Sequence, residues 1–327
     1  MTSKKKTLDT LKLLITDGCN LSCTYCVPEP RNKKMPRKKG LKHGEILRLL
    51  RALIPHGIVN LDFRGGEPLI KKWFFPVFEE VMRNQMFQRV SLMTNGVVLK
   101  DHAAALKDLG LNSLSVHVDS LNFEKYRRIT RGDHLYRIHA GLQEAEKVGF
   151  EKIRLYVVVI KGLNHKEIIE FALLTKEHAY EVVFLEYVPY DANETNARRL
   201  DLHYPLAKIR EDIDLFQKIL PAGEPDGKGG EIYRFEDGRG AIRFLRAVDG
   251  HICESCSRLM LTTEGLLGPC FLTEKYEDLK PLLALKEGQE GPGVAAAIRQ
   301  VLRWRPRKLP KQEKPFRFCN QLTFVDE

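Results

Sequence analysis

The sequence of 327 residues lacks any apolar run of the roughly 20 residues that a membrane-spanning helix needs, so we expect no membrane partner. Its first ten residues, MTSKKKTLDT, lack the apolar segment of a signal peptide. The seven cysteines fall into groups of three, three and one, which is not the pattern of a disulfide framework. These absences predict a cytoplasmic protein that works in a reducing compartment.

The chain is also poor in aromatic residues where they would be needed to read nucleic acid. The net charge is +10, and basic residues are dense at Arg31 to His43 and at Arg303 to Arg317. Only Trp304 and Phe316 are interleaved with them, and single-stranded RNA readers need several stacking rings. We therefore favour solvated loops over a nucleic-acid partner, while an acidic carrier or a phosphorylated ligand stays open.

Three cysteines, Cys19, Cys23 and Cys26, follow the apolar segment Leu11 to Ile15 in the run TDGCNLSCTYC. Iron–sulfur clusters select thiolate ligands, and a closed cubane takes four of them. Three thiolates leave one iron open to the amino and carboxylate groups of S-adenosylmethionine, which indicates radical chemistry. Tyr25, the aromatic residue just before the third cysteine, is expected to pack against the adenine of S-adenosylmethionine. A zinc knuckle is the alternative, but zinc prefers four ligands.

Further motifs accompany this loop along nearly the whole chain. They are RGGEPLI (64–70), MTNGVVL (93–99), VDSLNFEKYRRIT (118–130), VVIKGLN (158–164), FLEYVPY (184–190) and CESCSRLMLTTEGLLGPCFL (253–272). With these motifs the sequence resembles the radical S-adenosylmethionine superfamily, and within it the GTP 3′,8-cyclase family of molybdenum cofactor biosynthesis. The resemblance implies two 4Fe-4S clusters and S-adenosylmethionine as cofactors.

The resemblance also implies the ligands of the second cluster. Cys253, Cys256 and Cys270 reproduce the C-x2-C-x13-C spacing of the family's C-terminal domain, with a structural zinc site as the alternative. Cys319 has no counterpart in that three-cysteine pattern. It is either a small buried hydrophobe or a fourth thiolate that closes the cluster, and we hypothesise the latter.

Other cofactor-binding residues follow from the same resemblance. For the segment after the second expected strand, the resemblance implies contact with the amino group of the methionine moiety of S-adenosylmethionine. For the segment after the third, it implies contact with the nucleoside part. The residues are Gly65, Gly66, Glu67 and Pro68 for the first segment, and Thr94 and Asn95 for the second. His117 stands where the family usually has a serine, on the fourth strand, which changes the contacts expected there.

Short apolar strands alternate with amphipathic helices six times between residues 11 and 187, a rhythm that predicts a parallel sheet with outer helices. We expect an α/β fold: a partial (β/α)6 TIM-like barrel with a small C-terminal auxiliary iron–sulfur domain. Residues 221–240 are rich in Gly, Pro and charge, which predicts a linker. The expected domains are residues 1–225 and 226–327, the second covering the open mouth of the barrel.

Several positions depart from the basic residues that the cyclase family uses to hold a triphosphate. Lys161 and Arg258 are retained as substrate-binding or catalytic candidates, whereas Lys12, Val183 and Met260 stand at arginine positions. The family's terminal diglycine is also missing, because the chain ends CNQLTFVDE. Phosphate recognition favours guanidinium groups, so these changes predict a remodelled pocket for which GTP is not the preferred substrate.

The sequence therefore predicts a radical enzyme that abstracts hydrogen from a small-molecule substrate, with a phosphorylated one as an option. Its electron donor would be a flavodoxin or a ferredoxin. The alternatives are a true GTP 3′,8-cyclase, or a radical enzyme that modifies RNA or a peptide. A two-cluster electron carrier is a further alternative, but an electron carrier needs no site for S-adenosylmethionine.

Overall fold

The structure is a computed structural model that describes residues 8–26, 40–187, 200–223, 230–245, 256–270, 273 and 275–305. One sheet runs through them in the order β12-β11-β10-β1-β2-β3-β4-β5-β6-β9-β8-β7. The strands are β1 (Thr10–Thr16), β2 (Asn60–Gly65), β3 (Arg89–Thr94), β4 (Ser113–His117), β5 (Ile153–Val159), β6 (Glu181–Glu186), β7 (Ile219–Pro221), β8 (Gly230–Phe235), β9 (Ala241–Leu245), β10 (Arg258–Leu261), β11 (Leu266–Gly268) and β12 (Glu277–Asp278).

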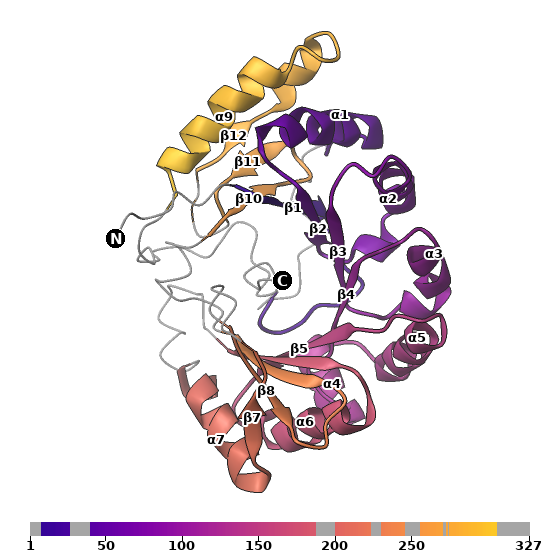
Figure 1. Ribbon diagram of the computed structural model, residues 1–327, viewed down its shortest axis with the longest axis vertical. Coiled ribbons are helices and arrows are strands. Elements are labelled where there is room, and N and C mark those ends of the chain that lie inside the picture. The colour runs from indigo at the N-terminus through magenta and orange to yellow at the C-terminus, as the bar shows by residue number, and fades with distance from the viewer. Residues whose placement is uncertain are drawn as a thin grey trace.

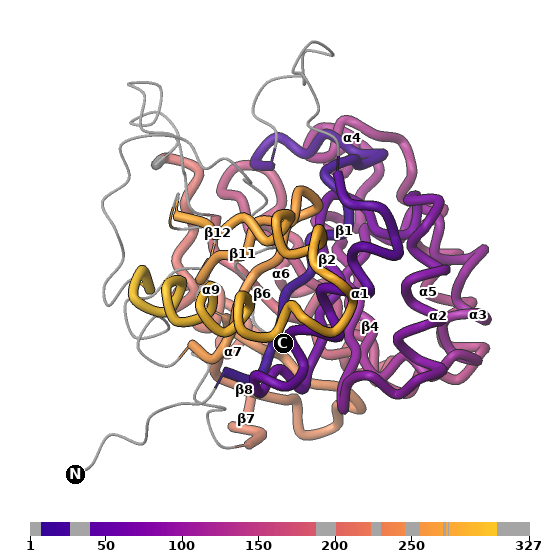
Figure 2. Tube along the Cα trace, turned by 90° about the horizontal axis from the view of Figure 1, so that it is seen from above, coloured from indigo at the N-terminus to yellow at the C-terminus, as the bar shows by residue number. Residues whose placement is uncertain are grey.

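The helices lie outside the curved sheet, and the strands form an open ring inside them (Figure 1). They are α1 (His43–Leu53), α2 (Phe74–Arg83), α3 (Ala103–Asp108), α4 (Phe123–Thr130), α5 (Leu135–Lys147), α6 (Ile168–Glu177), α7 (Leu206–Phe216) and α9 (Gly291–Arg303). Figure 2 shows the same molecule from above, with α9 near α1, and the two helices are in contact. This arrangement confirms the predicted α/β partial barrel.

Successive side chains of each strand point alternately to the helices outside the sheet and to the interior of the ring. On β1, Leu11, Leu13 and Ile15 pack into the large apolar cluster between the sheet and the helices. Lys12 and Leu14 alternate with them, because successive side chains of a strand point to opposite faces. The interior of the ring therefore receives the alternate residues of each strand, and this includes charged ones.

The segment predicted as a linker is partly strand. β8 begins at Gly230 and pairs in antiparallel fashion with both β7 and β9, and β9 continues the sheet beside β6 in parallel. The prediction for 221–240 was wrong over β8 because cross-strand hydrogen bonds with two neighbours stabilise a segment whose composition indicates a loop. The domain boundary after residue 225 falls between two strands that pair with each other, and it stays a prediction.

β10 and β11 pair in antiparallel fashion and form a hairpin. β10 lies parallel to β1, with Arg258 opposite Thr10, so this hairpin extends the barrel sheet at its β1 edge. The expectation that the C-terminal part covers the mouth of the barrel is therefore wrong for β10 and β11. Among the described helices, none is long and apolar enough to cross a membrane.

Candidate functional site

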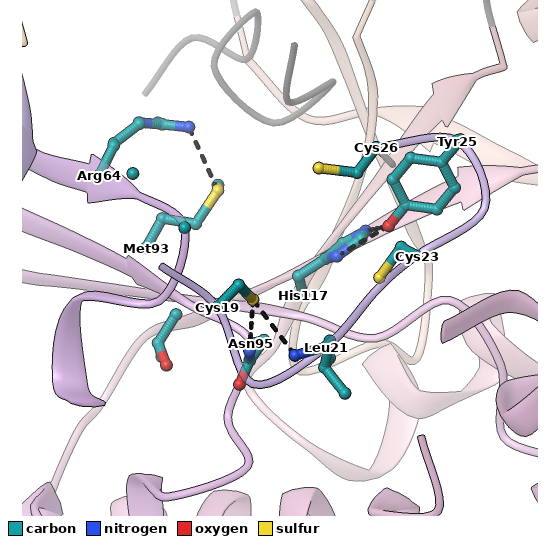
Figure 3. Close-up of a pocket in the computed structure, with 12 residues that line it drawn as sticks. Cys19, Leu21, Cys23, Tyr25, Cys26, Arg64, Met93, Asn95 and His117 are labelled. Atoms are coloured by element: carbon teal, nitrogen blue, oxygen red, sulfur yellow. Dashed lines mark hydrogen bonds between the residues drawn. The ribbon is translucent and has the colours of Figure 1, made fainter. Parts of the chain in front are cut away.

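The first cysteine loop follows β1 at the carboxyl end of the parallel strands. Cys19, Cys23 and Cys26 line one cavity, whose empty space, open solvent included, is about 510 Å³ (Figure 3). Cys26 N donates a hydrogen bond to Cys23 O at 3.0 Å, which tightens the loop. The structure thus brings the three predicted ligands of the first cluster together.

The surroundings of these thiols suit a cluster. Burial raises the pKa of Cys23, and nearby Asp119 and Cys26 raise it further, so a thiolate there needs a cation beside it. Leu21 N and Asn95 Nδ2 lie 3.4 and 3.5 Å from Cys19 Sγ, as donors do around cluster sulfurs. No three His, Cys, Asp or Glu side chains in the described ranges are grouped as a site for a single metal ion.

The glycine pair after β2 packs directly against the start of the cysteine loop. A Cβ on Gly65 would lie 2.2 Å from Thr16 O, and one on Gly66 would lie 2.1 Å from Gly18 O. Gly65 also has a φ of +138°, a conformation open to glycine. Both glycines line the cavity, so this cradle brings backbone to the place where the resemblance expects the methionine moiety.

Glu67 lies behind the cavity wall and holds the loop after β3. Its carboxylate accepts hydrogen bonds from Thr94 Oγ1 at 2.8 Å, from Asn95 N at 2.6 Å and from Leu69 N at 3.0 Å. Asn95 Nδ2 in turn donates to Asn20 Oδ1 at 2.7 Å, in the cysteine loop. Pro68 begins the short turn after Glu67 and is buried. Glu67, Thr94 and Asn95 therefore fix two loops relative to each other, and their predicted contacts with the cofactor stay predictions.

Substituting Glu67 by Gln should alter the pH dependence of stability. Burial raises the pKa of Glu67 from 4.5 to about 7, although its hydrogen bonds oppose the shift. Between these pH values the folded state binds more protons than the unfolded state, so Glu67 lowers stability as pH rises, by on the order of 3 kcal/mol. Urea unfolding at pH values from 5 to 8 measures this effect. The free energy of unfolding should fall less with rising pH for Glu67→Gln than for wild type. Parallel curves would contradict it.

Tyr25, which lies in the cysteine loop, forms a buried hydrogen-bonded group with His117 and Asp119. Tyr25 Oη donates to Asp119 Oδ2 at 2.6 Å and lies 3.2 Å from the His117 imidazole, and His117 Nε2 lies 2.8 Å from Asp119 Oδ1. Figure 3 shows the hydroxyl of Tyr25 directed at the ring of His117, and both side chains line the cavity. His117 therefore joins the network that holds Tyr25, and the predicted packing of Tyr25 on an adenine stays a prediction.

One side of the ring interior is charged. Lys12, Asp62, Arg64 and Arg258 are buried on β1, β2 and β10, and Asp62 accepts a hydrogen bond from Arg64 Nε. Burial lowers the pKa of Lys12 well below its usual value, and Arg64 and Arg258 lower it further. Burial also lowers the pKa of Arg258, with Arg64 contributing. This part of the interior suits an anionic ligand, because positive charge is concentrated there away from water.

The opposite side of the interior is apolar. Val183, Tyr156, Val158 and Leu185 from β5 and β6 form one cluster with Tyr25. Lys161 follows β5 and is exposed, and it does not line the cavity of the cysteine loop. The structure therefore does not bring the two catalytic candidates, Lys161 and Arg258, together, because Arg258 begins β10 at the amino end of the strands.

The second cysteine set lies at the other end of the barrel. Cys256 precedes β10 and Cys270 follows β11, so the antiparallel pairing places both at the same end of the hairpin. That end lies beside Thr10, because Arg258 pairs with Thr10. The first cysteine loop begins after Thr16, at the other end of β1, so the length of this strand, about 20 Å, lies between the two cysteine sets. Cys253 and Cys319 lie outside the described residues, so the fourth-ligand hypothesis stays a prediction.

Sequence reasoning missed three charged residues of the site. Asp62 and Arg64 alternate with apolar residues in NLDFRG, which is the pattern of a strand with a polar inner face. Asp119 follows β4 by two residues, where the carboxyl end of a barrel strand is expected to carry functional groups. In each case the signal was the position in or just after the strand. Arg64 and Asp119 lie inside the quoted motifs 64–70 and 118–130, but no role was assigned to them there.

Two family models match the chain. One describes the Radical SAM superfamily and matches residues 13–175, and the other describes Molybdenum Cofactor Synthesis C and matches residues 180–310. A structure of Streptococcus suis SuiB with S-adenosylmethionine is similar in fold, with a TM-score of 0.63, 15% identity, and coverage of 88% of this chain and 68% of that one. A structure of anSMEcpe with bound AdoMet has a TM-score of 0.59 at 14% identity, covering 98% and 92%.

Two curated GTP 3′,8-cyclases match over almost the entire length of both chains. A GTP 3′,8-cyclase of Thermodesulfovibrio yellowstonii is 32% identical over 95% of this chain and 96% of the relative. One of Pelotomaculum thermopropionicum is 32% identical over 92% of each. Molybdenum cofactor biosynthesis protein 1 of Dictyostelium discoideum is 32% identical over 83% of this chain and 43% of the relative. The chain is therefore a radical S-adenosylmethionine enzyme with S-adenosylmethionine and two 4Fe-4S clusters as cofactors, and it belongs to the GTP 3′,8-cyclase family.

Proposed function

We propose that this enzyme is a GTP 3′,8-cyclase of molybdenum cofactor biosynthesis. The observation that carries the proposal is the match of 32% identity over 95% of the chain to a relative of that name. The cysteine loop and the charged interior support it, since cationic side chains make charge-assisted hydrogen bonds to phosphate oxygens. The proposal replaces the sequence-based preference for another substrate, because the relatives favour the activity first held as the alternative.

The residues have separate tasks in this proposal. Cys19, Cys23 and Cys26 hold the first cluster, and Cys256 and Cys270 belong to the ligands of the second. S-adenosylmethionine, when reductively cleaved at the first cluster, supplies the 5′-deoxyadenosyl radical that removes hydrogen from the substrate. A flavodoxin or ferredoxin delivers the electron.

The ring interior would bind the nucleotide. Lys12 and Arg258 hold its phosphates on the charged side, where burial strengthens each charge-assisted hydrogen bond. The apolar side around Val183 and Leu185 excludes water from the reacting carbons. Lys161, at the rim, remains a candidate for a further phosphate contact.

Isotope transfer tests the proposal. We expect anaerobically reconstituted enzyme with dithionite to convert GTP carrying deuterium at C3′ into a cyclised nucleotide, separable by chromatography. The deuterium should appear in 5′-deoxyadenosine, because the cyclase reaction begins at C3′. A reaction without GTP serves as the control for uncoupled cleavage.

A second candidate is a related enzyme with a remodelled pocket. Met260 is buried beside Lys12 in register on β10, and Val183 is buried in the apolar cluster, so two arginine positions of the family carry no charge. Steady release of unlabelled 5′-deoxyadenosine with GTP left intact would reject the cyclase and favour this candidate. Other phosphorylated small molecules would then be screened for deuterium exchange.

A further inference from the structure

Arg64 carries the permanent positive charge of the cavity around the cysteine loop. Among the described residues that line this cavity, it is the one lysine or arginine. The cavity also contains the three thiols and the Gly65–Gly66 backbone. Figure 3 shows the guanidinium of Arg64 on the same side of the cavity as Met93, away from Tyr25.

The orientation of Arg64 is fixed by contacts at two of its guanidinium nitrogens. Asp62, two residues earlier on β2, accepts from Nε, and Met93 Sδ lies 3.2 Å from Nη1. Asp62 is itself held, because Ser91 Oγ donates to its Oδ1 at 3.1 Å. Arg64 is 2% exposed, so its side chain adopts this geometry in a water-poor environment. A guanidinium held in this way is suited to donate a charge-assisted hydrogen bond to a carboxylate.

The electrostatics of this place favour an added anion. Arg64 lies near enough to Lys12 to lower its pKa. Asp62 acts in the opposite direction on Lys12. Since burial weakens screening by water, an anionic group bound by Arg64 is stabilised more strongly than it would be at the surface.

The position next to the glycine pair identifies the anion. Gly65 and Gly66 are the backbone at which the amino group of the methionine moiety is expected, and in an α-amino acid the carboxylate shares a carbon with that amino group. We propose that Arg64 binds the carboxylate of the methionine moiety of S-adenosylmethionine, and that Asp62 positions its guanidinium. The proposal rests on the cysteine loop as the cofactor site and does not depend on GTP as the substrate.

The test compares S-adenosylmethionine with decarboxylated S-adenosylmethionine, which lacks only this carboxylate. Dissociation constants are measured by anaerobic equilibrium dialysis on reconstituted protein without substrate or reductant. Arg64→Met should weaken binding of S-adenosylmethionine by roughly 10- to 100-fold, the loss expected for one charge-assisted interaction. The same variant should change the affinity for the decarboxylated compound by less than about threefold. This compound has no carboxylate for Arg64 to bind, so removing the guanidinium removes no contact with it. The affinity of Arg64→Lys for S-adenosylmethionine should fall between those of wild type and Arg64→Met, since lysine keeps the positive charge but not the planar guanidinium.

Two further variants separate recognition from stability. Arg64→Met leaves Asp62 buried without its partner, so Asp62→Asn/Arg64→Met removes both charges and should show the same selective loss in a better-folded protein. Arg83→Met, at a side chain that is 72% exposed on α2, should bind both compounds as wild type does. Iron content and the visible spectrum of each protein report the cluster independently of binding. Equal weakening of both compounds by Arg64→Met and the double variant would overturn the proposal. Unchanged affinity for both compounds would also overturn it. If a separate dialysis with GTP alone then showed weakened GTP binding, Arg64 would be assigned to the substrate.

Discussion

Replacing Cys19, Cys23 and Cys26 together by alanine is expected to reduce 5′-deoxyadenosine formation under dithionite by at least about a thousandfold, equivalent to about 4 kcal/mol of barrier. The three thiols line one cavity at the end of β1, and without them no iron is held there. Release of 5′-deoxyadenosine, quantified by chromatography, provides the measurement.

The iron content gives this experiment its internal control. Since the second cysteine set lies at the other end of the barrel, the triple variant should keep one cluster and lose about half of its iron. Loss of all the iron would indicate a misfolded protein, and a double variant of Cys23 and Cys26 would then be used. Undiminished release from a variant with half the iron would reject the cysteine loop as the site of cleavage.

Substituting Gly66 by Ala should destabilise the protein by about 3 kcal/mol or more, because the new Cβ has no space. It would lie 2.1 Å from Gly18 O, a backbone atom of the cysteine loop. Either β2 or the loop must shift, so the first cluster should also be incorporated poorly. The midpoint of urea unfolding and the iron content after reconstitution measure the two effects.

Gly44→Ala is the matched control for this substitution. Gly44 lies in the first turn of α1, and a Cβ there would meet no atom within 4 Å. Alanine has the higher helix propensity, so the control should be as stable as wild type or more stable by up to about 1 kcal/mol. If Gly66→Ala were as stable as Gly44→Ala and took up iron normally, the close packing of the glycine cradle would be wrong.

The two cysteine sets lie at opposite ends of the barrel, with the interior between them. The first cysteine loop and the glycine cradle lie at the carboxyl end of the strands, and Cys256 and Cys270 lie at the amino end of β10. Between them the interior is charged around Lys12 and Arg258 and apolar around Val183. A substrate with an anionic part and a less polar part fits such a lining.

Local sequence was sufficient for the elements and for the first cluster. Apolar segments with alternating or helical periodicity predicted β1 to β6 and their helices, because burial of a sheet face and of a helix stripe is encoded within a few residues. The spacing of Cys19, Cys23 and Cys26 predicted a shared site, since three thiols so close in the chain lie in one loop.

Contacts between distant segments were decided by the tertiary structure. The strand β8 depends on pairing with β7 and β9, and the place of the second cysteine set depends on β10 lying parallel to β1. The closeness of Lys12, Arg64 and Arg258 also arises from three strands that become neighbours only in the folded sheet. Composition and spacing fix the chemistry that a loop can perform, but long-range strand order and register determine which charges share the interior, because that order is set by packing of the whole sheet.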